Sequence, residues 1–482
     1  MKKNKLKIVM VGLVLVLIIG QTVFAAGNYK IQALKMNTFV GKGNDTTIFA
    51  NGVKNNISSY TYTVNSKTTA ITTDDFYNNS SYIKFWSSHG LTTGKLYGSQ
   101  SGNCEVNVKD INPSWAGGNL EFVFIAACNQ LNGTAGLRSI YAKAMRGSNA
   151  VRVISGYHDT APGDADAAIT QKFIDYAKTG ESVKSSWILA NEYYKNDDSV
   201  GGYNARNYCV LTHSGNVQYS RIEGFSGSTY TRPGASSTTI LRFSAANPDG
   251  AIEIQSTNAL KNLEVPNYAL RAKPIDISVI GPNEIKNVSE DQIVSVVNKE
   301  IGDTKISMTK EQVIETGLEW LDINLKGLSS SQLKNGDMKI TPIVMAEVDT
   351  EGNGRNEVED TVAYILNYNN FYNGIRISGE GYDTIIDTTG VIAANAKWSE
   401  FEQINNKSQI QSVSYEQAKQ IVNNSLRTAY SLQLDAELEA TTDMKADIAF
   451  VFDEKDGLYY PTWIFNGNES VYKVNCLTGE LY

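Results

Sequence analysis

Two short apolar runs in the first third of the chain end in residues that carry chemistry. The first covers residues 82–90 and ends in Ser-His-Gly, which places His89 at its end. The second covers residues 120–128 and ends in Ala-Ala-Cys at Cys128. Runs this short, rich in aromatic and β-branched residues, are typical of buried strands. If the strands are parallel neighbours, both side chains emerge at the carboxyl edge of one sheet, where open α/β proteins place their sites.

The chain after Cys128 alternates between helical and strand-like patterns. Apolar spacing predicts three helices, over residues 134–145, 164–179 and 182–195. It predicts one strand between the first two helices, over residues 150–156. Such alternation is typical of a mostly parallel sheet with crossover helices on its faces. We therefore expect an α/β domain flanked by helices over residues 27–225.

The pattern changes after residue 225. A stretch rich in Gly, Ser and Thr predicts a linker or joint over residues 226–266. Beyond it, helical stretches at 289–297 and 309–327 alternate with hairpin-like strands. This predicts an α+β C-terminal region, divided into residues 267–400 and residues 401–482.

The first residues have the pattern of a secretory signal. Four lysines lie at or before position 7, an apolar stretch covers residues 8–19, and small residues allow cleavage after Ala25 or Ala26. The apolar stretch is too short for a comfortable membrane span, although an uncleaved anchor is the alternative. We expect a signal peptide over residues 1–25 and a secreted, extracellular protein exported by a bacterial Sec-type route, with no membrane attachment after cleavage.

Charge and cysteine content narrow the choice of partners. The chain carries 43 basic and 51 acidic residues, and loss of the signal lysines leaves it more acidic still. This argues against nucleic acid as a partner and against a basic membrane-binding patch. Four cysteines are too few for a disulfide scaffold. Cys128 is therefore a candidate nucleophile, a small buried hydrophobe, or a disulfide partner of Cys104 or Cys209.

The two strand ends resemble the caspase–gingipain–legumain group of cysteine peptidases, clan CD, in which an apolar strand ending in His-Gly precedes one ending in Ala-Cys. The resemblance implies a caspase–haemoglobinase-like fold in the first domain and cleavage of peptide bonds without a cofactor. It implies Cys128 as the nucleophile and His89 as the acid and base. Gly90 would donate its backbone N–H to the oxyanion hole, together with the N–H of Cys128.

The chain departs from that group at several positions. Ala126 stands where caspases have glutamine and legumains an acid, and Asn129 and Gln130 replace the Arg-Gly of caspases. The alternative is therefore a non-catalytic extracellular or cell-surface binding protein on the same fold, with a degenerate dyad. Asp159 and Asp164, after the third strand, are candidates for binding a basic substrate side chain, or are ordinary loop and helix-cap carboxylates.

The end of the chain resembles the PepSY domain. Ser414 and Gln417 are spaced as a helix capping box, Glu416 and Ala418 match the motif at the helix start, and a Thr-Gly hairpin closes the chain. The resemblance implies a binding role for this module. The expected partners are a protein or peptide substrate and, through the C-terminal half, cell wall or a surface protein.

One loop partly matches a calcium-binding pattern. Residues 349–360 offer Asp349, Glu351, Asn353 and Asp360 as candidate ligands. The segments on either side look like strands, which favours a solvated hairpin turn with calcium as the alternative. With three histidines in the chain, no zinc site is expected.

Overall fold

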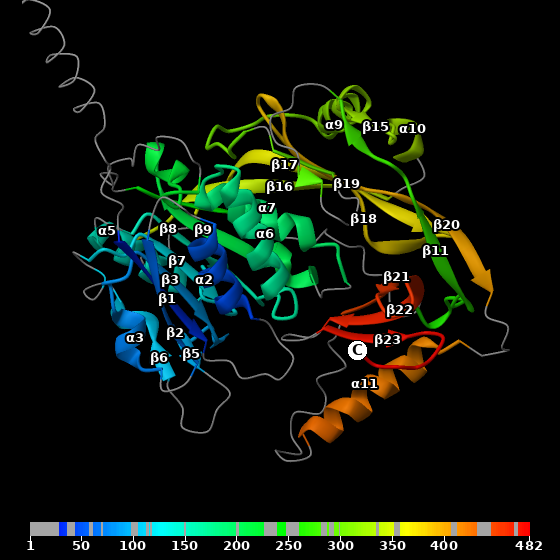
Figure 1. Cartoon of the computed structure of the whole chain (residues 1–482), viewed down its shortest axis with the longest axis horizontal. Coiled ribbons are helices and arrows are strands. Elements are labelled where there is room, and N and C mark those ends of the chain that lie inside the picture. Colours follow the sequence, from blue (N-terminus) through cyan, green and yellow to red (C-terminus); the bar gives the residue numbers. More distant parts are fainter. Residues whose placement is uncertain are drawn as a thin grey trace, which may run out of the picture.

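The computed structural model describes most of the chain beyond the predicted signal peptide, which lies outside the described residues. These are residues 28–35, 44–56, 61–68, 71–97, 105–111, 115, 118–148, 151–198, 202–225, 239–246, 260–280, 287–288, 294–297, 299–333, 337–350, 357–405, 412–430, 445–466 and 471–482. Cys104, Glu351 and Asn353 also lie outside them. Within these ranges the protein is a mixed α/β fold built on one large sheet (Figure 1).

The first half of the sheet is parallel. Its strands run in the order β2, β1, β3, β7 and β8, with the bounds Thr61–Lys67, Asn28–Lys35, Ile83–Ser87, Phe122–Ala126 and Val153–Tyr157. Every residue of β3, β7 and β8 is buried, as expected for strands covered on both faces. The predicted strands and their parallel pairing are confirmed.

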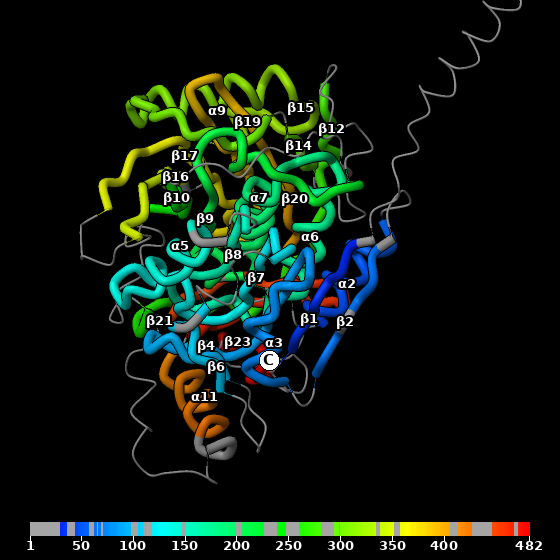
Figure 2. Tube along the Cα trace, turned by 90° about the vertical axis from the view of Figure 1, so that its left-hand side faces the viewer, coloured from blue at the N-terminus to red at the C-terminus, as the bar shows by residue number. Residues whose placement is uncertain are grey.

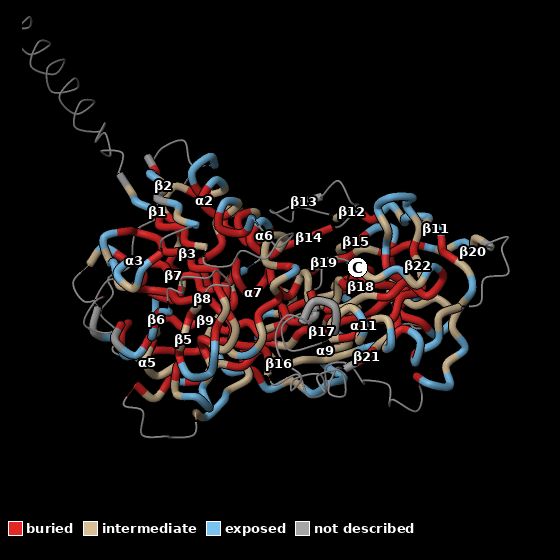
Figure 3. The backbone as a smooth tube through the Cα atoms, turned by 90° about the horizontal axis from the view of Figure 1, so that it is seen from below, coloured by how far each residue is buried: buried red, intermediate tan, exposed pale blue. Residues whose placement is uncertain are grey.

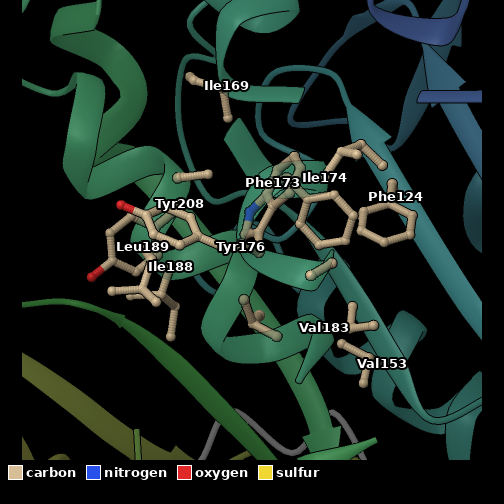
Figure 4. Packing of buried hydrophobic residues seen from close by; sticks show 14 of the residues in the cluster. Phe124, Val153, Ile169, Phe173, Ile174, Tyr176, Val183, Ile188, Leu189 and Tyr208 are labelled. Atoms are coloured by element: carbon tan, nitrogen blue, oxygen red, sulfur yellow. The ribbon is translucent and has the colours of Figure 1, made fainter. Parts of the chain in front are cut away.

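Helices cover both faces of this parallel half. On one face lie α2 (Asp45–Asn55), α6 (Asp166–Lys178) and α7 (Val183–Tyr194), and on the other α3 (Thr73–Tyr77) and α5 (Leu137–Ser148). Alternate residues of β7 pack on the two faces of the sheet, because successive side chains in a strand point to opposite sides. Figure 4 shows Phe124 of β7 packed beside Phe173 of α6, with ring centroids 4.9 Å apart. The three helices predicted from residues 134–195 are confirmed.

The sheet continues without a break into the second half of the chain. Strand β9 (Tyr208–His213) is antiparallel to β8, β10 (Ile240–Ala245) pairs with β9, and β16 (Asp337–Glu347) pairs with β10. Strand β10 lies inside the segment whose composition predicts a linker, yet all six of its residues are buried. An apolar strand with a neighbour on each side is part of the core, so residues 240–245 connect the two halves rather than separating them.

Antiparallel strands extend the sheet further. They are β17 (Asp360–Tyr372), β18 (Ile375–Asp387), β19 (Gly390–Lys397), β14 (Val294–Val297) and the short β13 (Asn287–Val288). The helix predicted over residues 289–297 is wrong where the structure describes it. Val294, Val296 and Val297 are β-branched and pair with the alanines of β19, which favours a strand.

One hydrophobic cluster joins the two halves. It includes Phe85 and Phe124 from the parallel strands and Ile343, Ile365 and Ile385 from the antiparallel strands. Figure 3 shows buried backbone from β3 and β7 through to β16 and β17. The predicted domain boundaries stay a prediction, but the two halves share this core.

The remaining elements pack around the second half. Helix α9 (Lys310–Asn324) begins in a capping box made by Thr309 and Gln312, and packs on β17, β18 and β19. The predicted helix over residues 309–327 is thus confirmed. Short elements close this end, namely α10 (Ser330–Leu333), β12 (Ser278–Val279) and β15 (Leu325–Lys326). In the described ranges no helix has the length and apolar character that crossing a membrane requires.

The C-terminal unit packs around α11 (Tyr415–Tyr430). Its strands are β11 (Tyr268–Pro274), β20 (Ser399–Asn405), β21 (Lys445–Asp453), β22 (Leu458–Asn466) and β23 (Val471–Asn475). The predicted capping box is present, because the backbone N–H of Ser414 donates to the Gln417 side chain at 2.8 Å and the Gln417 N–H donates back at 3.4 Å. Helices α9 and α11 lie at opposite ends of the molecule (Figures 1 and 2).

Candidate active site

Cys128 lies just beyond the carboxyl end of β7. Its side chain is half-buried, and its sulfur accepts a hydrogen bond from the Ala161 backbone N–H at 3.3 Å. Cys128, Cys209 and Cys476 are all reduced thiols, so the alternative Cys128–Cys209 disulfide is not formed. Cys209 and Cys476 are fully buried, and burial raises the pKa of both thiols. Among the described cysteines, Cys128 is the one with access to solvent.

His89 begins a small antiparallel sheet at the same edge. With Gly90 it forms β4 (His89–Gly90), which pairs with β5 (Lys95–Tyr97), and β5 pairs with β6 (Glu105–Asn107). The imidazole is half-buried and stacks on the ring of Tyr97, with centroids 5.1 Å apart and an interplanar angle of 26°. The small sheet therefore fixes the segment that carries His89.

The two strand ends predicted to meet are in direct contact. Ser87 at the end of β3 is paired with Ala126 at the end of β7, and the Ser88 N–H donates to the Ala126 carbonyl at 3.2 Å. Farther along, a Cβ atom on Gly90 would lie only 2.1 Å from the carbonyl oxygen of Cys128. This spacing admits no side chain at position 90, so glycine is required by the approach of the two backbones.

The turn after Cys128 is held by the neighbouring strand β8 and its loop. Asn129 adopts a left-handed conformation with φ of 62°. Its N–H donates to the Asp159 carbonyl at 2.8 Å, and the Leu131 N–H donates to the Tyr157 carbonyl at 3.0 Å. A non-glycine residue with positive φ stores strain that the surrounding hydrogen bonds must offset. The turn is therefore a fixed feature of this sheet edge.

The two carboxylates proposed for substrate binding are both exposed and belong to the loop that contacts the thiol. Asp159 and Asp164 flank Ala161, whose N–H contacts the Cys128 sulfur. A positive charge of the C-terminal unit also acts on Asp164 of this loop. Lys473 of β23 donates to the Asp198 carbonyl at 3.0 Å, and the negative charges of Asp198 and Asp164 partly offset the lowering of its pKa by burial.

His158 lies beside the site but is held as a neutral side chain. Its carbonyl accepts a hydrogen bond from the Asn132 side chain at 3.0 Å. Burial, and then the positive charge of Arg138, lower the pKa of His158 to about 4. Arg138 is itself paired with Glu357, which also accepts from Arg242 at 2.9 Å. The loop near residue 357 of the second half thus contacts the surroundings of the site.

Asp45 is a residue of this edge that the sequence pattern did not single out. It opens α2 and is 2% exposed. Burial raises the pKa of its carboxyl group, opposed by the neighbouring Ser87 hydroxyl. Burial, followed by the charges of Asp166 and Asp45 and more weakly Cys128, raises the pKa of Tyr157. Asp45 would be read from sequence only as a helix-start carboxylate, because its burial comes from packing against distant strands.

The calcium candidate stays a prediction, because Glu351 and Asn353 lie outside the described residues. Within the described ranges, no group of three or more His, Cys, Asp or Glu side chains is arranged to hold a metal ion. Asp360 is at the start of β17 and pairs with Lys305 at 2.5 Å. Asp349 follows the end of β16, which agrees with the predicted hairpin between two strands. His213 is buried and bonds to the Val151 carbonyl at 3.0 Å, as a packing histidine does.

A family model described as "Domain of unknown function (DUF6345)" matches residues 56–233, which include His89 and Cys128. No curated protein matches the sequence. Among solved structures, the complex of Porphyromonas gingivalis RgpB pro- and mature domains is similar over 75% of this chain and 68% of that chain, at 10% identity and a TM-score of 0.28. That TM-score is too low to transfer fold or function, and nothing in these comparisons supports the PepSY resemblance.

Proposed function

We propose that this protein is a secreted cysteine endopeptidase on a caspase–haemoglobinase-like fold, with Cys128 as nucleophile and His89 as acid and base. The observation that carries the proposal is the contact of the two strand ends, where Gly90 packs against the Cys128 carbonyl. A half-buried reduced thiol and a half-buried imidazole come from these adjacent segments. Such a pair is the minimum for nucleophilic catalysis by cysteine.

The chemistry assigns one role to each group. The Cys128 thiolate attacks the substrate carbonyl carbon, and the C=O electrons move onto oxygen. When the tetrahedral intermediate collapses, the C–N bond breaks and the His89 imidazolium gives its proton to the leaving amine. Water then attacks the thioester carbon and passes its proton to His89, and the C–S bond breaks, which releases the acid product and returns the Cys128 thiolate and the His89 imidazolium. The N–H groups of Gly90 and Cys128 are proposed to stabilise the oxyanion.

The substrate and the location follow from the same proposal. Asp159 and Asp164 are exposed beside the loop that contacts the Cys128 sulfur, which supports a peptide substrate with a basic side chain near the cut. The signal-like N-terminus supports an extracellular site of action. We propose that the unit built around α11 attaches the enzyme to cell wall or to a surface protein.

The test uses the full secreted chain and three variants. Wild-type protein should cleave members of a broad peptide library, and Cys128→Ala should abolish this cleavage. His89→Ala should reduce it by about 10²–10⁴-fold, as expected for loss of a general acid and base. His158→Gln is the matched control, because that imidazole is close to the site but has no role in the proposal. Wild-type protein that cleaves nothing would instead favour a binding protein with a degenerate dyad.

A further inference from the structure

Gln130 is a fully buried amide between the two catalytic segments. Its exposed fraction is 0%, although glutamine is ordinarily a surface residue. The side-chain nitrogen donates to the Cys128 carbonyl at 3.3 Å and to the Leu91 carbonyl at 3.5 Å. Leu91 directly follows His89 and Gly90 along the chain. One amide group therefore spans the segment that carries the imidazole and the segment that carries the thiol.

The backbone at Gly90 lies so close to Gln130 and Cys128 that these contacts fix the separation of the two segments. A Cβ on Gly90 would lie 2.8 Å from the Gln130 nitrogen as well as 2.1 Å from the Cys128 oxygen. Because the amide nitrogen carries two N–H donors, it can hold both carbonyl oxygens, which otherwise repel each other. Without the amide donor, the two backbone carbonyls would lose the group that joins them, although the Leu91 carbonyl also accepts from the Gly94 N–H at 3.0 Å. The two segments would then move apart.

Tyr141 of α5 sets the orientation of the amide. Its hydroxyl donates to the Gln130 side-chain oxygen at 3.1 Å. Burial holds the pKa of Tyr141 well above its ordinary value, so the hydroxyl stays protonated and remains a donor. Because the amide oxygen faces Tyr141, the amide nitrogen must face the two carbonyls. Helix α5 thus contributes to the geometry of the candidate site through this pair.

We propose that Gln130, oriented by Tyr141, is a positioning residue that holds His89 and Cys128 at their working separation, an inference that rests on the proposed peptidase function. Gln130 acts through the backbone of both segments and does not contact substrate. Gln130 is therefore part of the proposed active site, although it departs from the caspase pattern.

The experiment measures the rate of Cys128 alkylation by iodoacetamide against pH in the full chain. An imidazole beside the thiol should keep the thiolate populated below the ordinary thiol pKa of about 8.5. Gln130→Met keeps the side-chain volume but removes the donor, so its rate profile should move toward that of His89→Ala. A shift of one pH unit lowers the rate at pH 6.5 about tenfold. Tyr141→Phe should move the profile in the same direction by less.

Gln218→Met is the matched control for lost stability. Gln218 is 1% exposed, accepts from Lys184 at 2.7 Å and donates to Asp303 at 2.7 Å, away from Cys128. Its removal should lower stability and leave the alkylation profile unchanged. If Gln130→Met is not folded, Tyr141→Phe decides the question.

Two results would overturn the inference in distinguishable ways. If His89→Ala shifts the profile but folded Gln130→Met and Tyr141→Phe match wild type, Gln130 has no positioning role and the peptidase proposal survives. If His89→Ala leaves the profile unchanged, the dyad itself is absent, and the proposed function fails together with this inference.

Discussion

The Gly90 backbone packs against the carbonyl of Cys128 so closely that even one methyl group would not fit between them. In Gly90→Ala the added carbon would lie 2.1 Å from the Cys128 oxygen, so the backbone of one segment must move. We expect loss of the proposed peptidase activity and destabilisation of about 1–3 kcal/mol, as is common for overpacking. Activity assays and urea unfolding check this. Gly163→Ala is the control, because nothing lies within 4 Å of its added carbon. Equal activity and stability of Gly90→Ala and Gly163→Ala would contradict the close contact between Gly90 and the Cys128 carbonyl.

Cys128 should react with thiol reagents before the other described cysteines. Cys209 and Cys476 are fully buried and burial raises their pKa, so both remain protonated and inaccessible in the folded protein. Iodoacetamide treatment at neutral pH followed by peptide mapping should label Cys128 first, and labelling in denaturant should reach all of them. Recovery of Cys128 in a disulfide from the mature protein would refute its proposed role as nucleophile.

His158 should make the protein less stable in mild acid. Burial and the charge of Arg138 lower its pKa from the ordinary 6.5 to about 4, so the unfolded chain binds a proton between these values that the folded chain does not. Stability should therefore fall as the pH drops from about 6.5 to 4, by at most about 1.4 kcal/mol per pH unit from this residue. His158→Gln should unfold in urea with a shallower dependence on pH. If the free energy of unfolding depended on pH equally in wild type and His158→Gln, the imidazole in the folded protein would titrate normally.

Arg376 should be essential for joining the two halves of the chain. This buried guanidinium contacts the Asp198 carboxylate at 2.5 Å and the Asp447 carboxylate at 3.2 Å, and donates to the Asn196 carbonyl at 3.1 Å. Arg376→Met removes the guanidinium that pairs with both carboxylates, and loss of one partner from a buried ion pair typically costs about 3–5 kcal/mol. Urea unfolding measures the loss.

An exposed ion pair supplies the control for Arg376. Lys273 pairs with Glu402 at 3.1 Å with both side chains more than half exposed. Lys273→Met should change the free energy of unfolding by about 1 kcal/mol or less, because solvent screens such pairs. An Arg376→Met variant as stable as Lys273→Met would mean that the buried pair contributes little to the association of the halves.

Local patterns predicted much of the first half and its site. The strands that end near His89 and Cys128 were evident because aromatic and β-branched residues cluster over a few positions. The helix cap at Ser414 is visible in the same way, since Ser414 and its partner Gln417 are three positions apart. Interactions that close within one or two turns of chain are encoded locally.

Other features depend on residues that are distant in sequence. The polar composition around Ile240–Ala245 predicts a joint, but partners on both sides make it a buried strand. Residues 294–297 have apolar positions that suit a helix or a strand, and the alanines of β19 decide for a strand. Secondary structure in short apolar segments is often set by the surface on which they pack.

The sequence by itself determined the α/β pattern of the first half. It also determined that His89 and Cys128 follow the ends of two neighbouring parallel strands. Only the tertiary structure decided that Gly90 touches Cys128, that Gln130 bridges their segments, and that Asp45 is buried at the same edge. The physical reason is how far apart in sequence the interacting residues lie. Strand and helix propensities act between near neighbours in the chain, whereas burial and bridging hydrogen bonds exist only once separate strands have been brought side by side.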